Sequence, residues 1–147
     1  MEYLEAQADA VRKSLAGARA DELFKVAAEA GYLTALADGG EDATEREALV
    51  NAIETLSKGS VIEWESETFL DEAYGKVQSE GVEARCNAVG KQLKDLGNAE
   101  AGLLIGAIVA YASNGIEKSE AQTLEKIGNA AGIQRKQIAE IVKKARG

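Results

Sequence analysis

The chain has 147 residues with no proline, no histidine and one cysteine, and its formal net charge is −8. The absence of histidine excludes the usual zinc, haem and catalytic-triad sites, and the single Cys86 cannot form an internal disulfide. The negative charge makes nucleic acid a poor partner, because phosphate backbones are repelled. Helix formers such as alanine, leucine, glutamate and lysine are abundant, so we expect residues 1–147 to form a single all-helical domain.

Apolar residues recur at spacings of three and four, and glycines or capping residues separate the resulting segments. This pattern predicts a bundle of about seven or eight helices. The segments span about residues 3–15, 21–37, 43–57, 64–80, 82–96, 99–112, 119–131 and 135–145. The first segment is expected either to pack on the core or to serve in assembly with another copy. The second gathers its small and apolar residues on one side: Leu23, Ala27, Ala30 and Thr34.

The fourth segment is amphipathic and begins with a cluster of acids. Its apolar positions are Trp64, Phe69, Leu70, Tyr74 and Val77. The acids around Trp64 are Glu63, Glu65 and Glu67. They are expected mainly to stabilise the start of the helix, and an acidic docking edge for a basic partner is the alternative. Cys86, in the fifth segment, has no histidine to activate it and is expected to be a buried, unreactive thiol.

The longest apolar run, Ala101 to Ala112, is about half the ~20 residues that a membrane-spanning helix requires. It therefore predicts a buried core helix and no transmembrane segment. No charged region followed by an apolar stretch begins the chain, so no secretory signal is indicated and a cytoplasmic location is expected. The last segment is predicted to be a basic amphipathic helix. Its basic residues near the C-terminus interact favourably with the negative end of the helix dipole, and they could also contact an acidic partner or an anionic membrane.

An internal repeat appears when the numbering is shifted by 75. The repeats cover about residues 20–58 and 98–133, and Gly31 lies over Gly106. In the same register Ala37, Gly40, Asp42, Glu45 and Leu49 lie over Ala112, Gly115, Glu117, Glu120 and Leu124. Each copy is predicted to be a helix, a small-residue loop and a second helix, so the domain is expected to contain two pseudo-symmetric helix-loop-helix units.

The repeated loop permits two chemical interpretations. In each copy an acid is followed three residues later by glutamate, which is the spacing of a capping box. In the first copy Asp38 precedes Asp42 and Glu45 on a Gly-Gly loop, and carboxylates with backbone carbonyls are ligands that calcium accepts. The spacing is not that of an EF-hand. The second copy has Ser113 in place of Asp38, so a weaker site is expected there.

The sequence ADGGEDATE at residues 37–45, between an alanine-rich helix and an amphipathic one, resembles the signature of the TerB-like family of tellurite-resistance proteins. The resemblance covers roughly residues 20–146. It implies an all-helical fold and a non-enzymatic role as a metal-associated adaptor for protein partners, including membrane-associated complexes, in tellurite or other stress responses. It also implies a shared acidic cluster, comprising Asp38, Asp42, Glu45, Glu117 and Glu120.

Two other functions remain open. A carboxylate-bridged metal enzyme is conceivable in a helical bundle, although such proteins typically use Glu-x-x-His pairs and this chain has no histidine. A purely structural scaffold is the other alternative, with the acids serving only as helix caps. We expect a non-enzymatic binding protein, with calcium the favoured cation.

Overall fold

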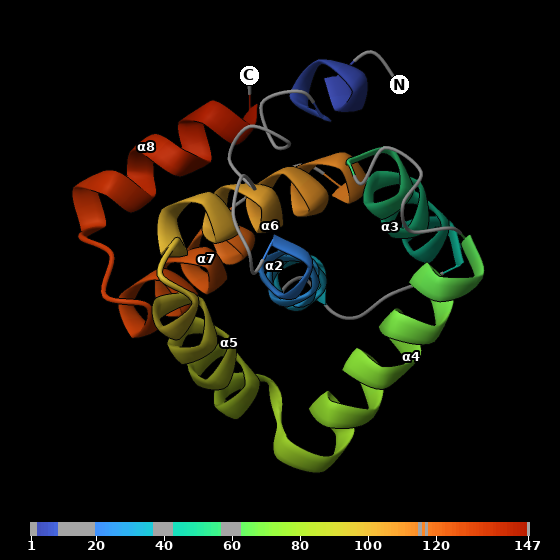
Figure 1. Cartoon of the computed structure of the whole chain (residues 1–147), viewed down its shortest axis with the longest axis horizontal. Helices are drawn as coiled ribbons and strands as arrows, with labels where there is room; N and C mark the ends of the chain where they lie inside the picture. The colour runs from blue at the N-terminus through green and yellow to red at the C-terminus, as the bar shows by residue number, and fades with distance from the viewer. Residues whose placement is uncertain are drawn as a thin grey trace.

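The computed structural model describes residues 3–8, 20–36, 43–56, 63–114, 116 and 118–146. Residues 3–8 are helical, and the further helices are α2 (Ala20–Ala35), α3 (Ala43–Leu56), α4 (Glu63–Glu80), α5 (Val82–Leu96), α6 (Ala99–Asn114), α7 (Lys118–Ala130) and α8 (Arg135–Arg146). The described residues contain no strand, so the all-helical prediction is confirmed for them. Figure 1 shows α2 in the middle of the helices, with α6 beside it.

Two left-handed glycines explain where α5 and α7 end. Gly97 has φ of 84° and its N–H donates to the Lys94 carbonyl, which closes α5. Gly132 has φ of 79°, and the N–H of the next residue, Ile133, donates a hydrogen bond of 2.9 Å to the Gly128 carbonyl. This is the hydrogen bond of a Schellman motif, for which glycine is favoured because side chains disfavour a positive φ.

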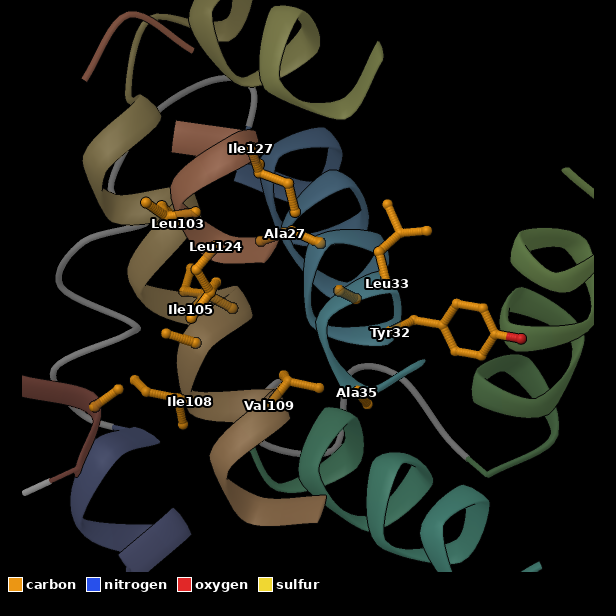
Figure 2. Close-up of a cluster of buried hydrophobic side chains, with 14 of the residues drawn as sticks. Ala27, Tyr32, Leu33, Ala35, Leu103, Ile105, Ile108, Val109, Leu124 and Ile127 are labelled. Atoms are coloured by element: carbon orange, nitrogen blue, oxygen red, sulfur yellow. The ribbon is translucent and has the colours of Figure 1, made fainter. Parts of the chain in front are cut away.

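The core is built around the crossing of α2 and α6, which contact each other more extensively than any other pair of helices. Figure 2 shows Ala27 and Leu33 of α2 in the same cluster as Leu103 and Ile105 of α6. Helices α3 and α8 pack on α6, whereas α5 packs on α2 and α7. Helix α6 is therefore a buried core helix, as its apolar sequence predicts.

Glycines make the close approach of α2 and α6 possible. A Cβ added at Gly31 would lie 2.7 Å from the Val109 Cβ and 2.9 Å from the Gly106 carbonyl oxygen. A Cβ added at Gly106 would lie 3.0 Å from the Ala27 carbonyl oxygen. The backbones of the two helices are thus in direct contact. Any residue larger than glycine at position 31 would force the helices to shift apart.

Helix α4 lies at the edge of the molecule, where it forms a V with α5 in Figure 1. Among its described side chains, residues 65–80, those of Ser66, Leu70 and Ala73 are buried. Phe69 and Val77 are half-buried, and Tyr74 is 49% exposed. The apolar stripe predicted from the sequence is therefore only partly covered, because α4 contacts α2, α3 and α5 much less extensively than α2 contacts α6.

The N-terminal helical residues pack on the core. Leu4 and Ala8 are buried, and the Tyr3 ring lies 5.0 Å from the Tyr111 ring of α6, measured between centroids. The Tyr3 hydroxyl donates a hydrogen bond to the Ala145 carbonyl at the end of α8. Burial, together with the nearby Tyr111, raises the pKa of Tyr3 to about 12. Residues 3–8 therefore pack against α6 and are joined to the end of α8 by the hydrogen bond of Tyr3.

Candidate functional site

Most of the predicted cation ligands fall outside the described residues. Asp38, Asp42 and Glu117 are not among them, and Glu45 is placed in α3 by its backbone alone. Glu120 is the predicted ligand whose side chain the structure describes. Convergence of the five carboxylates therefore stays a prediction.

Glu120 lies in the first turn of α7 and is only 1% exposed. The positive end of the helix dipole favours a carboxylate at this place. A buried carboxylate costs much free energy unless charged or hydrogen-bonding groups compensate for it. Glu120 therefore lies in the interior of the protein. Most glutamates that cap surface helices are instead exposed to solvent.

The second loop is also held by the C-terminal tail. Ile116, two residues before α7, is buried. The Nη2 atom of Arg146 donates a hydrogen bond of 2.6 Å to the Ile116 carbonyl. The basic end of α8 therefore supports the backbone that precedes Glu120, in addition to matching its own helix dipole.

Among the residues that the structure describes, no three histidine, cysteine, aspartate or glutamate side chains are grouped so as to hold a metal ion. This finding does not extend to the first loop, which contains Asp38 and Asp42 and lies outside those residues. In the same described part of the chain, no helix combines the length and the apolar character needed to cross a bilayer.

A buried ion pair that the sequence does not predict connects α2 to α5. Arg85 Nη2 lies 2.7 Å from Glu29 Oε2, and Arg85 Nε donates to the same oxygen at 2.9 Å. The two side chains are only 8% and 5% exposed. Burial by itself would lower the pKa of Arg85, but the hydrogen bonds and charges of Glu29 and Glu80 outweigh it and raise that pKa.

Two residues near the end of α4 extend this pair. Glu80 Oε1 lies 3.2 Å from Arg85 Nη1, and Lys76 Nζ lies 3.9 Å from Glu29 Oε1. The sequence contained a signal for this network, since Glu29 stands between alanines on the buried face of α2. A charged residue at such a position needs a buried partner, although the sequence does not identify Arg85 as that partner.

The start of α4 is attached to α3 by Arg46. Its Nη2 atom lies 2.7 Å from Asp71 Oδ1, and its Nε atom lies 3.7 Å from Glu67 Oε1. The same Nη2 donates to the Glu67 carbonyl at 2.9 Å. Glu67, one of the three acids around Trp64, is therefore paired within the protein, while the Trp64 side chain lies outside the described residues.

A groove with a volume of about 400 Å³ opens between α2 and α4. Its apolar lining comes from Phe24, Val26, Ala28, Ile53 and Phe69. Its charged lining comes from Lys25, Glu29, Glu65, Glu72 and Lys76. The volume falls within the range of about 300–1,000 Å³ that is usual for ligand pockets. The groove is therefore a second candidate binding site, separate from the repeated loops.

Cys86 is buried at 2% exposure in α5, as the sequence predicts. Burial raises the pKa of its thiol, as do Glu83 and Glu29, and the charge of Lys126 opposes them only in part. A thiol whose pKa is raised holds less of the nucleophilic thiolate at neutral pH. Cys86 therefore contributes to packing and has none of the features of an activated nucleophile.

Comparison with models of known protein families found no match, and no curated protein or solved structure is detectably similar to the chain. The resemblance to the TerB-like family therefore stays a prediction from the residues of the loops.

Proposed function

We propose that this chain is a non-enzymatic binding protein of the TerB-like type, whose acidic loops hold a divalent cation and whose helical surface engages a protein partner. The burial of Glu120 carries the proposal. A glutamate that only started α7 would gain its capping and dipole energy at the surface. A glutamate that serves as a ligand faces other oxygen donors, and the Glu120 side chain lies in the interior rather than in solvent.

The pseudo-symmetric repeat is part of the proposal. Gly31 and Gly106 occupy matching positions under the shift of 75, and they pack against each other at the crossing of α2 and α6. Leu49 and Leu124, which also match, are both fully buried. These pairs support two helix-loop-helix units, residues 20–58 and 98–133, that are related across the α2–α6 crossing.

The first loop is the stronger cation site in this proposal. It offers the carboxylates of Asp38, Asp42 and Glu45, whereas the second loop has Ser113 and Asn114 where the first has Asp38 and Gly39. Calcium is the favoured ion, because it accepts carboxylate and carbonyl oxygens in irregular geometries. The family resemblance adds a role in the response to tellurite or another stress, in contact with a membrane-associated complex.

Isothermal titration tests the cation site. Chelator-treated protein is titrated with calcium, manganese and zinc, and the Asp38→Ala variant is measured in parallel. Saturable heats are expected for the wild-type protein with calcium, and they should be lost in the variant because it removes a carboxylate from the stronger loop. Glu140→Ala, at an exposed position of α8, is the matched control and should bind like the wild type. Null heats from both wild type and Asp38→Ala would contradict the proposal.

A further inference from the structure

Helix α4 is the longest of the helices α2–α8, yet it buries few apolar side chains. It has 18 residues, and among its described side chains, residues 65–80, the buried apolar ones are Leu70 and Ala73. The neighbouring α5 has 15 residues and buries a stripe that runs from Cys86 to Leu93. Elements with few buried apolar contacts are those that open most readily in local fluctuations. We therefore expect α4 to separate from the core more easily than α5.

The interface between α4 and α2 is loosely packed and partly polar. The groove of about 400 Å³ lies between these two helices, whereas closely packed helices leave no space of that size. Figure 2 shows the buried Tyr32 ring directed from α2 towards α4, so a phenol group lies at this interface.

A second hydroxyl group, on α4 itself, weakens the packing of this helix. Ser66 is fully buried, and its Oγ atom has no hydrogen-bond partner in the part of the chain that the structure describes. A hydroxyl in this situation has lost its hydration without gaining a hydrogen bond, which costs free energy. Movement of α4 away from the core returns Ser66 to water and removes that cost.

Ion pairs to α3 and α5 hold α4 in place. Arg46 of α3 places its Nη2 atom 2.7 Å from Asp71 Oδ1, and Arg85 of α5 places its Nη1 atom 3.2 Å from Glu80 Oε1. The partners on α4 are accessible to solvent, since the side chains of Asp71 and Glu80 are 74% and 45% exposed. Exposed partners are hydrated when a pair separates, so such pairs break at a small cost in free energy.

Gly81 provides a pivot between α4 and α5. Its φ is 91°, and a Cβ added there would have no neighbouring atom within 4 Å. Its N–H donates to the Val77 carbonyl, and its own carbonyl accepts from the Arg85 N–H, so regular helix lies on both sides of it. Residues at the ends of elements commonly absorb the backbone rotation of a hinge. Asp71 lies about 15 Å away along α4, so a small rotation at Gly81 is enough to separate it from Arg46.

We propose that α4 is a hinged flap, which opens about Gly81 while the other helices stay packed, and that Arg46 is the latch that holds it closed. Opening uncovers the faces of α2 and α4 that contain Tyr32 and Leu70, both fully buried in the closed form. The chain is thereby able to present a hidden surface without global unfolding. The flap uses none of the acids of the repeated loops, so the inference goes beyond the proposed cation site.

The test measures how fast an aromatic disulfide reagent labels buried thiols of the full chain in EDTA. Ala73→Cys places a thiol on the buried face of α4, and the native Cys86 of α5 is the reference in the same molecule. Peptide mass spectrometry assigns the label, and each rate is divided by that of the same thiol in the unfolded protein. The introduced thiol should react at least about tenfold faster than Cys86. Leu70→Cys is a second reporter and should behave in the same way.

Urea and further substitutions then separate opening of α4 from unfolding of the whole domain. Low concentrations of urea should hardly accelerate labelling of the introduced thiol, because opening exposes little surface. Arg46→Met should accelerate it about two- to fivefold by removing the latch, and Ser66→Ala should slow it by removing the unpartnered hydroxyl. Circular dichroism checks that each variant is folded.

Ile138→Val is the matched control in the core, because α8 stays packed in the open form. It should raise the equilibrium constant of global unfolding about fivefold, as measured with urea, and leave labelling of the thiol introduced by Ala73→Cys within about twofold. If Ile138→Val accelerated that labelling as much as it favoured unfolding, α4 would open only with the whole domain and the proposal would be overturned.

Two other results would also count against the flap. An introduced thiol that reacted no faster than Cys86 would show that α4 is as firmly held as α5. A rate that Arg46→Met left unchanged would show that Arg46 is not the latch. Because the assay contains EDTA, neither result bears on the cation site, which the titration with calcium measures separately.

Discussion

Arg85→Met is expected to destabilise the protein by about 3–5 kcal/mol, because it leaves Glu29 buried without its guanidinium partner. Lys76 cannot replace that partner, since its Nζ lies 3.9 Å away on a side chain that is 48% exposed. Urea unfolding followed by circular dichroism measures the loss. The double variant Glu29→Met/Arg85→Met should recover much of the stability, because replacing both members of a buried pair by apolar residues is often nearly neutral.

An exposed ion pair between α5 and α7 supplies the control for this experiment. Lys126 Nζ lies 3.3 Å from Glu83 Oε1, and the two side chains are 57% and 81% exposed. Lys126→Met should change the free energy of unfolding by less than about 1 kcal/mol, as is usual for surface pairs. If Arg85→Met cost no more than Lys126→Met, the Glu29–Arg85 pair would have no special part in joining α2 to α5.

Gly31→Ala is expected to destabilise the protein by about 1–3 kcal/mol, the usual cost of inserting a methyl group into a packed core. The added Cβ would lie 2.7 Å from Val109 Cβ and 2.9 Å from the Gly106 carbonyl oxygen, so the crossing of α2 and α6 has to shift. The backbone oxygen offers no rotamer by which the contact is relieved. Urea unfolding gives the change in the free energy of unfolding.

Gly75→Ala is the matched control, since Gly75 also lies inside a helix, α4. A Cβ at Gly75 has no neighbouring atom within 4 Å, so only helix propensity changes. Alanine should therefore stabilise the protein by about 0.5–1 kcal/mol. Stabilisation by both substitutions would contradict the close packing of α2 on α6.

The sequence predicts the helices well, because each helix depends on local patterns. Helix α5 was expected at residues 82–96 and is found at Val82–Leu96, between Gly81 and Gly97. The core face of α2 was also predicted correctly, since Leu23 and Ala27 are buried. Helix α6 extends to Asn114, two residues beyond the predicted end, which is an ordinary uncertainty at a helix terminus.

Contacts between helices were less predictable, because they depend on how distant parts of the chain pack. Glu29 and Arg85 are 56 residues apart, and no local spacing links them. The partial exposure of Phe69 and Tyr74 depends on how far α4 stands from α2, which its amphipathic sequence does not determine. The candidate site is hard to predict for the same reason. Local spacing places Glu120 at the start of α7, but it does not show which other oxygen atoms lie near its carboxylate.

In the proposed function, the acids of the repeated loops bind a cation and do more than cap helices. The most direct test compares the melting temperatures of the wild type and Asp42→Asn, with and without calcium. At a calcium concentration of about 100 times the Kd, binding should raise the melting temperature of the wild type by about 5–10 °C and leave that of the variant unchanged. If Asp42→Asn instead lowered the melting temperature by the same amount with and without calcium, capping alone would explain the acids, and the cation site would be contradicted.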